Sequence, residues 1–206
     1  MPTTGKTAAQ KTGAIVRRPT QKVRGAPLAA HPLHRRVVPH GEKIEMGLSA
    51  HQKNGGHDEW LTPPEILRAL GAFDLDPCAP VVRPWDTATR HYTVADDGLA
   101  LPWVGRVWCN PPFGREAVKW LRRMRDHGNG VALIPARTET AMFYETVWGA
   151  ADGVLFLKGR PHFHYVDGRR ADFNSGAPIA LVAYGEANLD ALRHSGLGFV
   201  VVGHNA

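Results

Sequence analysis

Residues Asn110-Pro111-Pro112-Phe113 have side chains and spacing that could hold a planar amino group. They follow the apolar run 104–109, which predicts a buried strand ended by turn residues. Two consecutive prolines remove two backbone donors and fix φ near about −65°, and a proline also disfavours the α region at the residue before it. The chain therefore leaves the strand stiffly and presents an amide, a backbone carbonyl and an aromatic ring together. The two oxygens could accept the hydrogens of an amino group while the ring stacks on the attached base. A simple Pro-Pro strand terminator is the alternative.

The elements that must position this turn alternate between strands and helices. Thr62-Pro63-Pro64 predicts a helix start, with Thr62 as the N-cap, and Gly71 predicts its end. The remaining patterns predict strands over 73–76, 104–109, 131–134, 154–157, 162–166, 179–184 and 199–202, and helices over 116–125 and 140–148. This alternation favours an α/β fold around a mainly parallel sheet. Ligands of such sheets bind at the carboxyl ends of the strands, where Asp76 and Asn110 both fall.

The charge of the chain is concentrated near its N-terminus. The 206 residues have a net charge of +6, and residues 1–50 alone carry nine basic and two acidic residues. This segment is rich in Pro, Gly and Thr and lacks periodicity, so we expect residues 1–45 to be a disordered basic tail and 46–206 to be the catalytic domain. A basic tail can bind a polyanion by releasing counterions, or it can simply be solvated.

Several other classes of protein are disfavoured by the sequence. No run of roughly 18 apolar residues could span a membrane, and no secretory signal is recognisable. The two cysteines, Cys78 and Cys109, have apolar or Pro-flanked surroundings that predict burial, which favours a reducing cytoplasm. His162 and His164 would share one face of a strand, but no third ligand accompanies them, so we expect no metal site.

Three segments in this order carry a resemblance to a known family. They are Trp60-Leu61-Thr62-Pro63-Pro64, Phe73-Asp74-Leu75-Asp76-Pro77-Cys78-Ala79 and Asn110-Pro111-Pro112-Phe113. Together they resemble the phage-type DNA N6-adenine methyltransferases, small Dam-like enzymes that use S-adenosylmethionine. The resemblance spans 47–184 and implies a class I methyltransferase-like (Rossmann-like) fold, with a mainly parallel sheet and helices on both faces. Only about twenty residues separate Asp76 from Asp97, so the fold should be shortened around its second strand.

The resemblance implies catalytic roles for the Pro-Pro turn, residues Asn110, Pro111, Pro112 and Phe113. The side-chain oxygen of Asn110 would accept one hydrogen of the adenine N6 amino group and the Pro111 carbonyl the other. Phe113 would stack on an adenine flipped out of the duplex. Direct in-line methyl transfer would follow, with most of the rate supplied by orientation and acceptor placement.

The resemblance also implies a set of cofactor-binding residues for S-adenosylmethionine: Trp60, Thr62, Pro63, Asp76, Pro77 and Asp97. Thr62 and Pro63 would hold the methionine end of the cofactor, and Asp97 would meet its adenosine moiety. Asp96 is a close alternative to Asp97. Helix capping and turn formation are the structural alternatives for Thr62 and Asp97, respectively. The acid that normally binds the ribose hydroxyls has no clear counterpart.

Double-stranded DNA is the implied partner, although no separate target-recognition domain is visible. The favoured DNA contacts are Arg115, Arg137, Lys158 and Arg160, and further candidates are Lys119, Arg122, Arg123, Arg169 and Arg170. Each could instead be a solvated surface charge.

The sequence leaves two other functions open. One is a degenerate methyltransferase fold that binds DNA or cofactor without turnover. The other is methylation of a glutamine side-chain amide in protein, for which the acceptor geometry would be the same. The leading hypothesis is a cytoplasmic, site-specific adenine-N6 methyltransferase of a phage, prophage or restriction-modification system.

Deletion of residues 1–40 should weaken DNA affinity at low salt and leave the fold intact, because a basic arm adds counterion release. The measurement is the dependence of DNA affinity on salt concentration, with circular dichroism as the control for folding. An unchanged salt slope would show that the tail is not a DNA arm.

Overall fold

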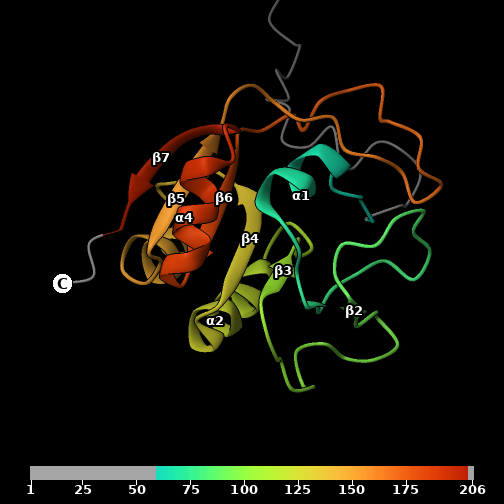
Figure 1. The fold of residues 1–206 in the computed structure, drawn as a ribbon, viewed down its shortest axis with the longest axis horizontal. Coiled ribbons are helices and arrows are strands. Elements are labelled where there is room, and N and C mark those ends of the chain that lie inside the picture. Colours follow the sequence, from blue (N-terminus) through green and yellow to red (C-terminus); the bar gives the residue numbers. More distant parts are fainter. Residues whose placement is uncertain (1–58, 204–206) are drawn as a thin grey trace, which may run out of the picture. The chain divides into compact units, whose positions relative to one another are not determined.

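A computed structural model describes residues 59–203 of the chain (Figure 1). The predicted basic tail, 1–45, lies outside the described residues. Within 59–203, no helix is long and apolar enough to cross a membrane.

The described chain folds around one seven-stranded sheet with the strand order β2-β1-β3-β4-β6-β5-β7. The strands are β1 (Leu75–Asp76), β2 (Arg90–His91), β3 (Val107–Cys109), β4 (Gly130–Pro135), β5 (Gly153–Leu157), β6 (Ile179–Tyr184) and β7 (Gly198–Val202). β4 and β6 are buried over nearly their whole length and form the centre of the sheet.

The sheet is mixed, so the predicted mainly parallel sheet is only partly confirmed. The pairings β2–β1, β1–β3 and β3–β4 are parallel, and those of β6 with β4 and β5, and of β7 with β5, are antiparallel. Because β4 and β5 both run antiparallel to β6, they point in the same direction. Five strands therefore have their carboxyl ends at one edge of the sheet, while β6 and β7 are reversed.

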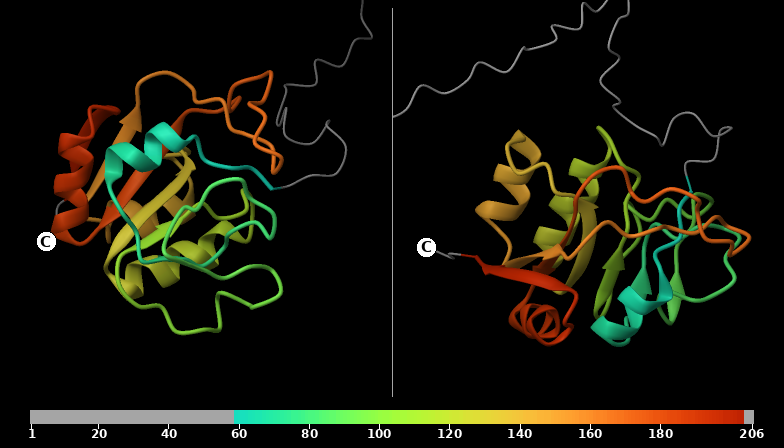
Figure 2. Two further views of the ribbon diagram at one scale, coloured as in Figure 1. Left: turned by 45° about the vertical axis from the view of Figure 1, so that its right-hand side comes forward. Right: turned by 90° about the horizontal axis from the view of Figure 1, so that it is seen from above.

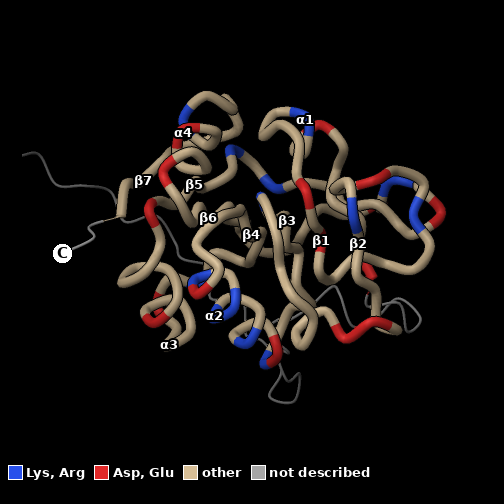
Figure 3. Tube along the Cα trace, turned by 60° about the horizontal axis from the view of Figure 1, so that its bottom comes forward, with Lys and Arg blue, Asp and Glu red and all other residues tan. Residues whose placement is uncertain are grey.

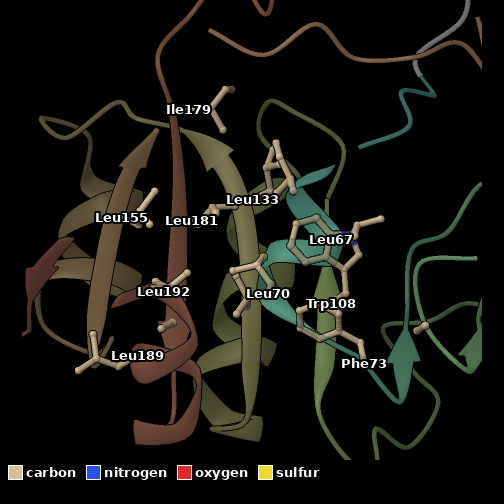
Figure 4. Packing of buried hydrophobic residues seen from close by; sticks show 14 of the residues in the cluster. Leu67, Leu70, Phe73, Trp108, Leu133, Leu155, Ile179, Leu181, Leu189 and Leu192 are labelled. Carbon is tan, nitrogen blue, oxygen red and sulfur yellow. The ribbon is translucent and has the colours of Figure 1, made fainter. Parts of the chain in front are cut away.

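Helices cover both faces of the sheet, as predicted (Figure 2). The helices are α1 (Pro64–Leu70), α2 (Ala117–His127), α3 (Ala141–Phe143) with its π-helical continuation η2 (Tyr144–Trp148), and α4 (Glu186–His194). α1 and α4 pack on one face, where their leucines contact alternate residues of the strands (Figure 4). α2, α3 and η2 pack on the other face. The two apolar clusters fix the sheet between them.

The predicted N-cap role of Thr62 is wrong. The helix begins at Pro64, one residue later than an N-cap at Thr62 implies, and its N-cap is Pro63, which has extended backbone angles. A residue that precedes a proline is disfavoured from the α region, so Pro63 cannot join the helix and Thr62 lies one position too far away to cap it. Gly71 ends the helix at a φ of 84°, as the sequence predicts.

Three further segments differ from the sequence prediction. The predicted strand 162–166 is instead part of a loop, in which His164 makes only isolated bridges to Leu61 and Arg170. The short strand β2 lies in a stretch predicted to be loop, and α4 was not predicted. The predicted helix 140–148 is confirmed, and the Thr140 side chain caps it by accepting from the Phe143 N–H.

Arg106 links several elements by hydrogen bonds at the end of the sheet opposite the Pro-Pro turn. Its guanidinium donates to the carbonyls of Leu70 and Ala72 (2.9 and 2.8 Å) and to the Asn188 side-chain oxygen (2.7 Å). It also lies 4.2 Å from the centroid of the Phe73 ring. One side chain thus joins the end of α1, the start of β1 and the buried side of α4.

Arg106→Ala should lower the free energy of unfolding by about 2–4 kcal/mol, because several half-buried acceptors lose a charged donor together. Urea denaturation measures the change. Arg193→Ala, which removes an exposed pair with Asp190, is the matched control and should stay within about 0.5 kcal/mol of the natural chain. Equal effects of the two substitutions would contradict this role for Arg106.

Candidate active site at the carboxyl ends of β1 and β3

The order of the strands reverses at β1. The chain passes from β1 to β2 on one side and then crosses to β3 on the other side of β1. Open α/β sheets bind ligands at such a switch point, outside the carboxyl ends of the strands. Asp76 is the last residue of β1 and Asn110 directly follows β3, so the topology brings the two predicted motifs together.

The Asn110 side chain is held in one orientation. Its Nδ2 donates to the backbone carbonyl of Trp60 at 3.0 Å. A carbonyl can only accept, so the amide nitrogen must face Trp60 and the amide oxygen must point elsewhere. Among the described residues, no donor reaches Asn110 Oδ1 or the Pro111 carbonyl. The turn therefore presents two unused acceptors on adjacent residues.

Phe113 stands beside these acceptors with 37% of its surface exposed. Its ring packs edge-to-face on Phe163, with the ring centroids 6.2 Å apart. Pro111 is buried and Pro112 is exposed, so the turn is anchored on one side only. The ring is thus supported by the protein while part of it remains accessible to a ligand.

The segment before α1 is bound to the loop between β5 and β6, residues 158–178. Leu61 exchanges two backbone hydrogen bonds with His164, at 2.9 and 3.0 Å. The ring of Trp60 lies 5.1 Å from that of Tyr165. The carbonyl that orients Asn110 is therefore fixed by a second part of the chain, about fifty positions beyond the turn.

Asp76 is buried, with 3% of its surface exposed, and organises the loop that follows β1. One carboxylate oxygen accepts from the Thr87 hydroxyl at 2.5 Å and the other from the Cys78 N–H at 3.1 Å. Burial raises the pKa of Asp76 to about 6, against the lowering effect of those two hydrogen bonds. Both oxygens are thus engaged within the protein, and this carboxylate shapes the loop around it.

The predicted cofactor segments 76–77 and 96–98 meet in the structure. A Cβ added to Gly98 would lie 1.9 Å from the Pro77 carbonyl oxygen, so only glycine permits this contact. The Trp103 indole donates to the Gly98 carbonyl at 2.7 Å and holds the turn in place. Any larger residue at position 98 would separate the two segments.

The two neighbouring acids of this turn have different roles. Asp96 accepts from the N–H and the hydroxyl of Thr93, at 2.8 and 2.9 Å, so its carboxylate stabilises the turn. Asp97 is exposed, has a left-handed backbone with φ of 48°, and has no side-chain partner among the described residues. Asp97 is therefore the better placed of the two to meet a ligand.

Thr62 and Pro63 are both buried at the start of α1. The Thr62 hydroxyl has no hydrogen-bond partner among the described residues. A buried hydroxyl without a partner is costly, so it is a candidate for a contact that a bound molecule completes. Trp60, Thr62 and Pro63 thus line up along the segment that also fixes Asn110.

The four favoured DNA contacts lie at the same edge of the sheet as Asn110. Arg115, Arg137, Lys158 and Arg160 follow β3, β4 and β5, whose carboxyl ends share that edge. All four are exposed, and none forms an ion pair with another residue of 59–203.

The basic residues along α2, blue in Figure 3, instead form contacts within the protein. Lys119 pairs with Glu116 at 2.7 Å and Arg122 with Glu145 at 2.6 Å. Arg123 donates to the Leu101 carbonyl at 2.8 Å. These side chains border a hollow of about 470 Å³ on the α2 side of the sheet.

The two histidines of the 158–178 loop belong to its framework. One ring nitrogen of His162 lies 3.0 Å from the Ala171 carbonyl, and His164 packs edge-to-face on Trp85. Within the described residues, no group of three potential metal ligands is present. Cys109 is buried, as predicted, and Cys78 is half-buried with its sulfur 3.7 Å from that of Cys109.

Thr87 and Phe163 are parts of the site that sequence reasoning missed. Thr87 lies in a loop without periodicity, and Phe163 lies in the segment predicted to be a strand. Their roles depend on contacts with Asp76 and Phe113, which are distant in sequence. No local pattern carries that information.

The fold and the site define an α/β protein with two unused acceptors on adjacent residues at its switch point. The chain belongs to the DNA N-6-adenine-methyltransferase (Dam) family, whose model matches residues 49–184. This match confirms the resemblance drawn from the three motifs and supports DNA adenine methylation as the activity in broad terms. No curated protein and no solved structure matches the chain.

Substitution of Asp76 should change how stability depends on pH. Its pKa in the folded chain, about 6, lies above the ordinary value of 3.8. Below about pH 4, the protonated carboxyl makes its full contribution to the free energy of unfolding. This contribution is lost as the pH rises through about 6. Asp76→Asn removes the titration, so its stability relative to the natural chain should rise by about 2 kcal/mol between about pH 4.5 and about pH 8.

Urea unfolding of the cofactor-free protein at the two pH values measures this difference. Asp86→Asn removes an exposed carboxylate and controls for the loss of one negative charge. A stability difference between Asp76→Asn and the natural chain that stays constant across this range would contradict the assignment.

Proposed function

We propose that the chain is a site-specific DNA adenine-N6 methyltransferase that acts on an adenine flipped out of the duplex. The observation that carries the proposal is the hydrogen bond from Asn110 Nδ2 to the Trp60 carbonyl. It leaves Asn110 Oδ1 and the Pro111 carbonyl as neighbouring acceptors beside the half-exposed ring of Phe113. Such a set matches an amino group attached to a planar base.

The two acceptors would act on the N6 nitrogen itself. An adenine amino nitrogen is planar and its lone pair is delocalised into the ring, so it is a poor nucleophile. Hydrogen bonds to both N–H groups draw electron density onto N6 and favour a pyramidal nitrogen, whose lone pair can attack. Because the acceptors are held by Trp60 and by a proline ring before the base arrives, little reorganisation is needed during the reaction. Phe113 would fix the plane of the base by stacking.

S-adenosylmethionine is the methyl donor that we propose for this site. When bound, it supplies a methyl group from its sulfonium sulfur, which keeps the electron pair of the broken bond while N6 gives up one proton. Trp60, Thr62 and Pro63 would hold its methionine end, since the buried Thr62 hydroxyl has a hydrogen bond to give. Asp97, next to the contact between Gly98 and Pro77, would hold its adenosine end. Asp76 would act by shaping this loop.

The class I methyltransferase layout is proposed on the same grounds. The switch point at β1, the five strands of one direction and the helices on both faces support it. β2 has only two residues, as expected for a fold shortened around its second strand. Residues 46–206 would form the catalytic domain and 1–45 a basic tail.

Double-stranded DNA would approach the edge of the sheet that carries Asn110. Arg115, Arg137, Lys158 and Arg160 are exposed there and have no carboxylate partner among the described residues, so they are available for phosphates.

Incubation of the purified protein with labelled S-adenosylmethionine and either DNA or a protein extract separates the alternatives. Label in N6-methyladenine supports this function. Label in protein would indicate methylation of a glutamine amide, and cofactor binding without transfer would indicate a DNA-binding protein without turnover.

Asn110→Ala should lower methyl transfer to DNA at least about a hundredfold, a loss typical of removing one preorganised polar group from a reacting centre. Cofactor affinity, measured by calorimetry, should change little. Asn129→Ala is the matched control, because Asn129 directly precedes β4 at the opposite edge of the sheet. Retained transfer in Asn110→Ala would refute the acceptor pair.

A further inference from the structure

The loop 158–178, which contacts the candidate active site through Phe163 and His164, also carries an exposed phenylalanine. Phe173 has 74% of its surface exposed, although phenylalanine is among the residues most often buried. A single exposed apolar side chain needs no explanation by itself. The backbone around Phe173, however, distinguishes it from an incidental surface residue.

Phe173 lies in a bulge between two anchored positions. The Ala171 N–H and the Ser175 N–H each donate at 2.8 Å to carbonyls of the segment 161–163. Between these two bonds, the three residues 172–174 oppose a single residue of that segment. Bulges of this kind often lie beside active sites, where they redirect a side chain. Here the bulge turns Phe173 outward.

The bulge is also rigidified by short-range hydrogen bonds. The Gly176 N–H donates to the Asn174 side-chain oxygen at 3.1 Å, and the Ser175 hydroxyl donates to the Ala177 carbonyl at 2.6 Å. The Nδ1 atom of His162 lies 3.0 Å from the Ala171 carbonyl oxygen. Phe173 is therefore presented on a preorganised support.

That support is joined directly to the turn that carries the acceptors. Phe163, whose carbonyl receives the Ala171 N–H, packs on the ring of Phe113. His164, its neighbour, is paired with Leu61, next to the carbonyl that orients Asn110. Two separate contacts, Phe163 with Phe113 and His164 with Leu61, therefore connect the support of Phe173 to the acceptor pair.

The net charge of the loop 158–178 favours a nucleic acid as the molecule that Phe173 meets. The loop carries four basic residues against Asp167 and Asp172, a net charge of +2. Lys158, Arg160 and Arg170 are exposed and form no ion pair with another described residue, whereas Arg169 is paired with Asp167 at 2.7 Å. Cations of this kind bind phosphates, and an apolar wedge between them can enter a base stack.

We propose that Phe173 inserts into the base stack of duplex DNA at the position from which the target adenine is flipped. Phe113 would stack on the extruded base, and Phe173 would fill the space left in the duplex and so keep the base outside. This inference rests on the proposed function. It assigns extrusion to the 158–178 loop and chemistry to the Pro-Pro turn.

The test uses the full chain and duplex DNA in which 2-aminopurine, which fluoresces when unstacked, replaces part of the adenine. At saturating protein, the natural chain should raise the fluorescence. Phe173→Ala should lose most of that rise, and its transfer to unmethylated duplex DNA should fall about tenfold or more, since base extrusion carries an unstacking cost. Its affinity for S-adenosylmethionine should be unchanged, and Phe173→Trp should restore both signals.

Phe199→Ala is the matched control, because Phe199 is also 74% exposed but lies on the edge strand β7. It should behave as the natural chain does. Full fluorescence and transfer in Phe173→Ala, or equal losses in Phe199→Ala, would overturn the inference. If the natural chain transfers no methyl group to DNA, the proposed function itself has failed, which is a distinguishable result.

Discussion

The hydrogen bond between the Asn110 amide and the Trp60 carbonyl is the interaction on which the rest of the site depends. An asparagine side chain at the end of a strand could rotate and present either its donor or its acceptor. A backbone carbonyl that faces the nitrogen removes this choice and leaves the oxygen as an available acceptor. The Trp60 segment is itself fixed by its pairing with His164. Three parts of the chain must therefore be correctly placed before one acceptor is available.

The topology of the sheet gathers these parts at one edge. The switch point places the ends of β1 and β3 side by side, and the shared direction of β3, β4 and β5 brings the basic residues of their following loops to the same edge. At the opposite edge, Arg106 fastens α1, β1 and α4. The residues that stabilise the fold and the residues of the candidate site thus lie at opposite ends of the strands. A ligand site of this kind can hold strained or unpaired groups, such as the left-handed Asp97 and the Thr62 hydroxyl, because the core does not depend on them.

Much of this arrangement could be predicted from local rules. The strands 130–135 and 179–184 follow from apolar runs, and the Pro-Pro turn and a helix start within one residue of α1 follow from proline chemistry. The predictions failed where the local structure is determined by contacts with residues distant in sequence or by neighbouring residues acting together. Two prolines in sequence moved the N-cap away from Thr62, and the loop 158–178 is held by single bridges instead of a strand ladder. α4 was missed because only Leu189 and Leu192 form its apolar stripe, although its acidic first turn and basic last turn were a usable signal. The partners Thr87 and Phe163 could only be found in three dimensions.

Cellular DNA offers a test of whether the acceptor pair selects the N6 amino group of adenine. The most direct measurement is nucleoside analysis of DNA from a host without adenine methylation, before and after the protein is expressed in it. N6-methyladenine should appear, at positions that share a common sequence. DNA that gains methylated cytosine instead, or gains no methylated base while the protein binds S-adenosylmethionine, would contradict this role of the acceptor pair.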